Sequence, residues 1–244
     1  MKKKYILGVL LCLIVAVICL IKFLPEKAPE KVPEVKTEIK SEPGEEAKPY
    51  ESPINFTKLQ KGNADIYAWL TIPGTNVDYP VLQSPEDDTL YLDHNDKKEK
   101  DANGALFTEH VYNSNDFSDP VTVIYGHHMR SGAMFGNLQQ DYTDKFDDLT
   151  EIIVYLPDRE LHYEVFAAVP YSNLHILYHF HEFDTPDMMT AFIDDVKMTH
   201  AIGATVKSDV TVGEGDQLIV LSTCLQGNNT NRFLVIGKCV EEIS

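Results

Sequence analysis

Two apolar runs near the C-terminus, Gln217-Leu-Ile-Val-Leu-Ser-Thr-Cys224 and Arg232-Phe-Leu-Val-Ile-Gly-Lys-Cys-Val240, flank a short polar loop. Read as the two strands of a hairpin, they place Cys224 and Arg232 opposite each other beside the loop. Cys239 then lies next to the start of the first strand, roughly 20 Å from Cys224 at about 3.3 Å per residue. A disulfide needs Cα atoms within about 7 Å, so we expect Cys224 to be a free thiol.

The chain before this hairpin is dominated by further short β-type runs, which are separated by clusters of Gly, Pro, Asn and Asp. These runs are Tyr67–Ile72, Val77–Leu82, Ala105–Phe107, Val121–Tyr125, Ile152–Leu156 and Leu161–Val169. Together with the hairpin they make eight strands, a number typical of a barrel or a sandwich. The expected fold class is therefore mainly β.

Two segments carry a helical pattern instead. Thr185 and Pro186 form a helix start, and apolar residues follow at three- and four-residue spacing from Met188 to Val196. Core packing explains these methionines and aromatics better than a ligand site does. A weaker pattern over Asn55–Ala68 predicts a helical segment near the start of the folded domain.

The N-terminus predicts a membrane anchor over residues 1–24. Lys2, Lys3 and Lys4 precede an apolar run, and the whole segment approaches the roughly 20 residues that a bilayer core requires. The lysines favour a cytoplasmic N-terminus, which would place the rest of the chain outside a single-pass anchor at the cell membrane. A cleaved signal peptide is the alternative, although the run is bulky and lacks a small-residue cleavage site.

Residues 25–50 are rich in Pro, Glu and Lys, a composition that cannot bury enough apolar surface to fold alone. We interpret them as an extended linker, and residues 51–244 as one folded domain. The formal net charge of −17 argues against nucleic acid as a partner, because no basic cluster lies beyond the N-terminus. The sequence contains no Gly-rich phosphate loop and no paired-cysteine zinc spacing.

Three residues at strand ends could carry chemistry together. Cys224 ends an apolar strand, which is a rigid platform for a nucleophile, although cysteines are also common as small core residues. His127 follows the strand Val121–Tyr125 and could exchange a proton with a thiol near neutral pH. Arg232 could bind a carbonyl oxygen and stabilise the oxyanion formed on it. Taken singly, His127 and Arg232 are more often structural.

Taken together, the three segments resemble the sortase family of cysteine transpeptidases. Leu221-Ser222-Thr223-Cys224 is similar to the family's Leu-x-Thr-Cys signature, Gly126-His127 to its histidine motif, and Arg232 to its active-site arginine. The resemblance covers most of Trp69–Lys238. The two helical segments and the string Tyr125-Gly-His-His-Met129 are similar to class B sortases in particular.

The resemblance implies an eight-stranded β-barrel, with an N-terminal helical segment and a helix inserted before the seventh strand. It implies that Cys224 attacks a threonine carbonyl in the sorting motif of a surface protein, that Arg232 holds the developing charge, and that His127 protonates the departing amine. An amine of a peptidoglycan precursor or cross-bridge, or a pilin lysine in some relatives, then resolves the thioester. No cofactor or metal is needed. Leu92, Ser222 and Thr223 match positions near the substrate groove of relatives.

Two readings of the same residues remain open alongside this one. A surface cysteine peptidase would use the same dyad with water as the acceptor, and a noncatalytic anchored binding module would use Cys224 only as core filler. The histidines His175, His179 and His181 have a spacing that could suit a metal, but no carboxylate or cysteine in the sequence nearby completes a recognisable site. A role for residues 175–183 in lining the substrate groove is the preferred interpretation.

Overall fold

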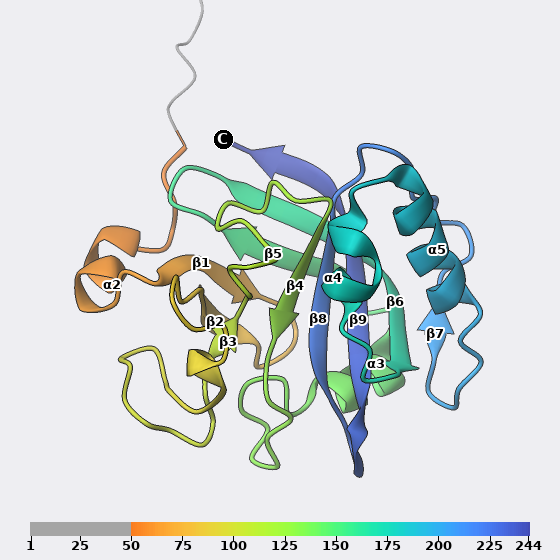
Figure 1. The fold of residues 1–244 in the computed structure, drawn as a ribbon, viewed down its shortest axis with the longest axis horizontal. Coiled ribbons are helices and arrows are strands. Elements are labelled where there is room, and N and C mark those ends of the chain that lie inside the picture. The colour runs from red at the N-terminus through yellow and green to blue at the C-terminus, as the bar shows by residue number, and fades with distance from the viewer. Residues whose placement is uncertain (1–49) are drawn as a thin grey trace, which may run out of the picture. The chain divides into compact units, whose positions relative to one another are not determined.

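The computed structural model describes residues 50–244 as a β-barrel with helices on its outside (Figure 1). The strands are β1 (Ile66–Thr71), β2 (Asp78–Leu82), β3 (Leu106–Phe107), β4 (Val121–Tyr125), β5 (Glu151–Tyr155), β6 (Glu160–Tyr171), β7 (Thr205–Val206), β8 (Leu218–Leu225) and β9 (Asn228–Ile243). The helices are α2 (Phe56–Gly62), α3 (Leu138–Lys145), α4 (Ile176–His179) and α5 (Pro186–Lys197), with short 3-10 turns η1 (Leu90–Leu92) and η2 (His181–Phe183).

Eight of these strands close into a ring. They follow the order β5-β1-β2-β3-β4-β8-β9-β6, and pairing of β5 with β6 completes the barrel. The pairs β2–β3 and β4–β8 are parallel, and the others are antiparallel. The two-residue β7 joins β6 outside this ring. The predicted eight-stranded barrel is therefore confirmed, and β7 is an addition that the sequence analysis did not foresee.

The barrel has a core on each face of its central strands. Ile219 and Leu221 of β8 pack in the interior, whereas Leu218 and Val220 face outward against the helical layer. Successive side chains of a strand point to opposite faces, so both sets of positions must be apolar here. This two-sided burial explains why β8 reads as a continuous apolar run without polar alternation.

The outer core is covered by α4 and α5, which lie beside β8 and β9 in Figure 1. Met189, Phe192, Ile193 and Val196 form the buried face of α5. This confirms the predicted helix before the strand that carries Cys224, including its start at Pro186.

The predicted N-terminal helix is present but shorter than expected. α2 ends at Gly62, and Ile66 already belongs to β1, so the extension of the predicted helix to Ala68 was wrong. Asn63 adopts an extended backbone and its side chain donates to the Tyr91 hydroxyl at 2.9 Å, which turns the chain from helix into strand.

The described part of the chain, residues 50–244, contains no helix that is both long enough and apolar enough to cross a membrane. The predicted anchor, residues 1–24, and all but the last residue of the predicted linker, 25–50, lie outside the described residues.

Candidate active site

The carboxyl ends of β4 and β8 meet at one end of the barrel because the two strands are parallel. Tyr125 pairs with Ser222, and the Gly126 N–H donates to the Ser222 carbonyl at 3.1 Å. His127 follows β4 by two residues, so it lies at the same end of the barrel as Cys224 near the end of β8. The hairpin partner β9 brings Arg232 opposite Cys224, as the sequence predicted.

Cys224 and Arg232 share the outer face of the barrel. Leu221 of β8 and Phe233 of β9 point into the interior, so the alternation of side chains directs residues 224 and 232 outward. The Arg232 Nη1 donates to Cys224 Sγ at 4.0 Å, and it also donates to the Asn231 carbonyl at 3.3 Å. The half-buried sulfur therefore lies next to a fixed guanidinium, which is the arrangement an oxyanion-stabilising arginine requires.

His127 is oriented by a backbone carbonyl. Its Nε2 lies 2.7 Å from the Leu92 oxygen. A carbonyl oxygen only accepts, so Nε2 carries a hydrogen and the lone pair of the neutral ring is on Nδ1. The neutral and the protonated ring can both make this contact, which holds the ring in place through a proton-transfer cycle.

The position of the Leu92 carbonyl depends on close packing of its backbone against Gly104 and Ala105. Gly104 has a φ of +61°, and a Cβ there would lie 2.4 Å from the Tyr91 oxygen and 3.0 Å from the Leu92 oxygen. The Ala105 N–H donates to the Tyr91 oxygen at 3.0 Å and ties the two segments together. The resemblance to sortases implied a groove position for Leu92, whose side chain is 45% exposed. It did not imply this main-chain role, because a carbonyl leaves no mark on residue type.

The adjacent His128 lies in different surroundings. It forms an isolated bridge with Met134, and its Nδ1 is buried without a hydrogen-bond partner in the described residues. Burial lowers the pKa of His128 below its usual value. The His127 ring is therefore held by a hydrogen bond and the His128 Nδ1 is not, and the choice of His127 as the proton-transfer group stays a prediction.

The two predicted groove residues on β8 face opposite sides. Ser222 shares the outward direction of Cys224, and Thr223 points toward the interior, where its Oγ1 has no partner among the described groups. Both side chains are almost fully buried. Ser222 therefore shares the face of Cys224 but is covered, the Thr223 side chain faces the interior, and the groove role of both residues stays a prediction.

Cys239, the other cysteine of the folded domain, is remote from this site. Its N–H donates to the Gln217 carbonyl at 2.8 Å, at the opposite end of β8. Both cysteines are free thiols, and burial raises the pKa of Cys239. The expected absence of a Cys224–Cys239 disulfide is confirmed.

A polar cavity of about 710 Å³ adjoins the site on the side of the β8–β9 loop. Its lining comes from the segment after His127, the start of α3 and the loop: His128, Met129, Arg130, Gly136, Asn137, Gln140, Gln226 and Gly227. The Gln226 N–H donates to Gln139 Oε1 at 2.9 Å and so fastens the loop to α3. The sequence analysis did not predict α3 or this cavity.

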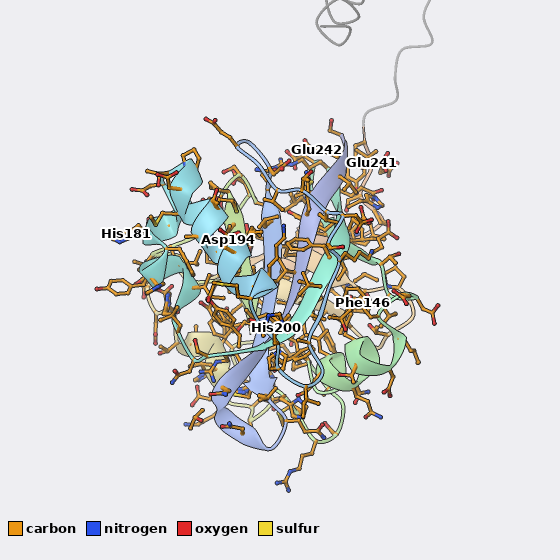
Figure 2. The ribbon with its side chains drawn as sticks, turned by 90° about the vertical axis from the view of Figure 1, so that its right-hand side faces the viewer. Phe146, His181, Asp194, His200, Glu241 and Glu242 are labelled. Atoms are coloured by element: carbon orange, nitrogen blue, oxygen red, sulfur yellow. The ribbon has the colours of Figure 1, made fainter. Side chains whose placement is uncertain are left out.

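The histidines 175, 179 and 181 do not converge. Figure 2 shows His181 at the outer edge of the molecule, and the His175 ring contacts Glu109, with Nε2 2.9 Å from Oε2. In the described residues no group of three or more His, Cys, Asp and Glu side chains could hold a metal ion. The sequence analysis missed Glu109 as the partner of His175.

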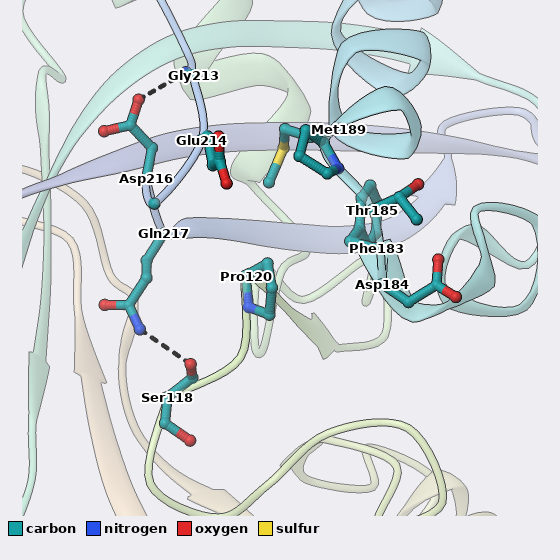
Figure 3. A pocket seen from close by; sticks show the side chains of 12 residues that line it. Ser118, Pro120, Phe183, Asp184, Thr185, Met189, Gly213, Glu214, Asp216 and Gln217 are labelled. Carbon is teal, nitrogen blue, oxygen red and sulfur yellow. Dashed lines mark hydrogen bonds between the residues drawn. The ribbon is translucent and has the colours of Figure 1, made fainter.

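Another cavity, of about 310 Å³, lies at the far end of β4 and β8 (Figure 3). Pro120 and Gln217, which precede these two strands, line it together with Phe183 and Met189. An eight-residue strand spans roughly 25 Å. This cavity is therefore separate from the site around Cys224.

Comparison with known proteins identifies the family of the chain. A family model described as the sortase domain matches residues 70–240. The chain therefore belongs to the sortase family.

The similar relatives are class B sortases. Sortase B of Listeria monocytogenes is 37% identical over 186 residues, covering 75% of this chain and 72% of the relative. The solved Listeria monocytogenes structure has a TM-score of 0.62 at 34% identity and covers 75% of this chain and 99% of that one. A Staphylococcus aureus sortase B–substrate complex has a TM-score of 0.66 at 25% identity, over 78% and 87% of the two chains.

Proposed function

We propose that this chain is a membrane-anchored transpeptidase that cleaves a sorting motif in secreted surface proteins and joins them to an amine of the cell wall peptidoglycan or its precursor. The observation that carries the proposal is the approach of Arg232 Nη1 to Cys224 Sγ, at 4.0 Å. His127 follows β4, the strand that runs parallel to β8 and pairs with it. Membership in the sortase family supports the transfer reaction.

The first step is attack of the Cys224 thiolate on the carbonyl carbon of a threonine in the motif. The C–N bond breaks, the donor's N-terminal fragment becomes a thioester, and His127 gives a proton to the departing amine. Arg232 stabilises the negative oxygen of the tetrahedral intermediate. An acceptor amine then attacks the thioester, and His127 takes its proton as the thiolate leaves. The polar cavity beside Gln226 offers room for that acceptor.

A peptidase would differ only in using water for the second step. The full chain, in detergent micelles, would be incubated with a degenerate peptide library, with and without hydroxylamine as a small amine nucleophile. We expect mass spectrometry to find peptide hydroxamates ending at threonine when hydroxylamine is present. Only the free acid under both conditions would reject amine transfer and favour the peptidase.

A noncatalytic binding module would leave Cys224 as an ordinary thiol. We expect Cys224 to react with iodoacetamide about tenfold faster than Cys239, because burial raises the pKa of Cys239 and the thiolate is the reactive form. Peptide mapping resolves the two sites. Equal rates, together with intact wall attachment in a Cys224→Ala strain, would favour the binding module.

A further inference from the structure

A cluster of titratable side chains lies beside the catalytic residues and has no part in the mechanism above. It comprises Glu109 and Tyr112 on the β3–β4 connection, Tyr125 at the end of β4, and His175 just before α4. His175 Nε2 lies 2.9 Å from Glu109 Oε2, with the two side chains 35% and 19% exposed. The contact joins segments 66 residues apart in the sequence.

The hydrogen bonds fix the tautomer of His175. Its Nδ1 accepts from the Tyr178 N–H at 3.1 Å and so caps the start of α4. Nε2 must then carry the hydrogen that is donated to Glu109. One neutral imidazole therefore caps the helix and binds the carboxylate at the same time. The Tyr112 ring packs against it with a centroid distance of 4.7 Å.

Glu109 also reaches the catalytic end of the barrel. Burial raises the pKa of Tyr125 strongly, and the charge of Glu109 and its hydrogen bond with the Tyr125 hydroxyl raise it further, whereas Arg232 lowers it. The centroids of the Tyr125 and His175 rings lie 6.5 Å apart, so the cluster extends to the end of β4. Tyr125 itself lies two residues before His127.

The helix α4 depends on contacts with the rest of the fold. It has only four residues, too few for a helix to be stable alone. The turn that follows is strained, since His181, Glu182 and Phe183 have φ values of 49°, 55° and 58°. Leu174, Ile176, Leu177 and Phe180 anchor this region in the outer core, and the contact between His175 and Glu109 adds a polar attachment at its start.

Each of the two joined segments exposes a large apolar side chain. Val111, two residues after Glu109, is 60% exposed, and Tyr178 of α4 is 72% exposed. Two backbone hydrogen bonds close the turn that carries Val111. The N–H groups of Tyr112 and Asn113 donate to the main-chain carbonyl oxygen of Glu109 at 3.2 and 2.9 Å. The contact between Glu109 and His175 therefore holds together the two backbone segments that carry Val111 and Tyr178.

We propose that Glu109 and His175 are positioning residues that fasten α4 to the β3–β4 connection, so that Val111 and Tyr178 form a preorganised apolar wall for the donor peptide. The inference rests on the proposed function for its substrate. It predicts that loss of the contact from the His175 side weakens donor binding and spares the chemical step, because His175 lies outside the segments that carry Cys224, His127 and Arg232.

The variants separate this contact from helix capping. His175→Asn keeps a side-chain oxygen that caps a helix well but cannot reach Glu109. Glu109→Ala removes the acceptor, and Glu109→Gln keeps one oxygen for the Nε2–H. His162→Asn is the matched control, since it removes another His–Glu contact, at 2.8 Å, on the β5–β6 hairpin.

The experiment uses the full chain in micelles and the best-cleaved peptide of the degenerate library as donor. We expect Glu109→Ala and His175→Asn each to raise the donor KM about tenfold, as loss of a charge-assisted hydrogen bond implies. The kcat of His175→Asn should stay within about twofold, the double variant should raise KM no more than either single one, and Glu109→Gln should retain near-normal KM. Unchanged KM, additive losses, or an equal effect of His162→Asn would overturn the proposal.

Backbone hydrogen exchange tests the contact between Glu109 and His175 independently of the transfer reaction. If Glu109 fastens α4, exchange of residues 176–180 and 111–113 should rise in Glu109→Ala and His175→Asn and not in His162→Asn. Unchanged exchange would contradict the contact's role whatever the activity. A wild-type chain that leaves every library peptide intact would instead reject the proposed function.

Discussion

At the scale of single residues, the account depends on a sulfur and a guanidinium held together by hairpin register. Cys224 pairs with Arg232 in the β8–β9 ladder, so a rigid backbone sets their separation. The short polar loop between the two apolar runs limits which residues can face each other, because loop length sets the register of a hairpin. This is why the pairing of these two residues could be predicted from sequence.

The same scale gives the first prediction, which concerns Arg232→Lys. A lysine keeps the charge but loses the planar array of donors that can hold a sulfur and an oxyanion together. We expect kcat for amine transfer to fall by about 10²- to 10³-fold, as for removal of one oxyanion donor. Arg159→Lys, on the β5–β6 turn, is the control and should be nearly silent. Comparable activity of Arg232→Lys and wild type would remove Arg232 from the proposed mechanism.

At the scale of elements, the strands were predictable and several contacts between loops were not. Apolar runs bounded by turn residues marked each barrel strand. α3 escaped notice because only Leu138 and Tyr142 are buried in it, which is too weak a pattern over eight residues. The Leu92 carbonyl and the Glu109 carboxylate reach the histidines through chain folding far beyond local sequence, so no spacing rule could have revealed them.

The turn that carries His127 provides the second prediction. A Cβ at Gly126 would lie 2.5 Å from Leu106 Cδ2 and 2.6 Å from Phe135 Cδ2, closer than packed carbons tolerate. We expect Gly126→Ala to cost about 1–3 kcal/mol of unfolding free energy and to displace His127. Urea denaturation measures the stability, and amine transfer measures the activity.

Gly62→Ala is the control for this substitution. Gly62 ends α2 and has no atom within 4 Å of the added carbon. Alanine is the better helix former by about 0.5–1 kcal/mol, so this variant should be as stable as wild type or slightly more so. A Gly126→Ala variant as stable and active as Gly62→Ala would show that the turn has more room than the structure indicates.

At the scale of the whole molecule, the β5–β6 closure of the barrel contains a pH-dependent contact. His162 Nδ1 lies 2.8 Å from Glu151 and Nε2 lies 3.1 Å from Glu160. Burial alone would lower the pKa of His162, but the hydrogen bonds and charges of the two carboxylates outweigh it and raise the pKa. The protonated ring is therefore the form that stabilises the closed barrel.

The third prediction follows from the sign of this shift. A raised folded-state pKa contributes stability that is fully present below the unfolded value of about 6.5 and is lost as the pH rises through the folded value. The melting temperature of wild type should exceed that of His162→Gln most at about pH 5.5, and the difference should shrink toward about pH 8.5. A difference that is constant, or that grows with pH, would contradict the assigned contact.

The central claim, that Cys224 forms a thioester with a donor peptide, is tested most directly by intact-mass spectrometry of the full chain after rapid quenching with a cleavable peptide in excess. We expect an adduct with the mass of the N-terminal peptide fragment, mapped to Cys224, removed by hydroxylamine and absent in Cys224→Ala. Peptide cleavage without such an adduct, or an adduct that persists in Cys224→Ala, would contradict the account.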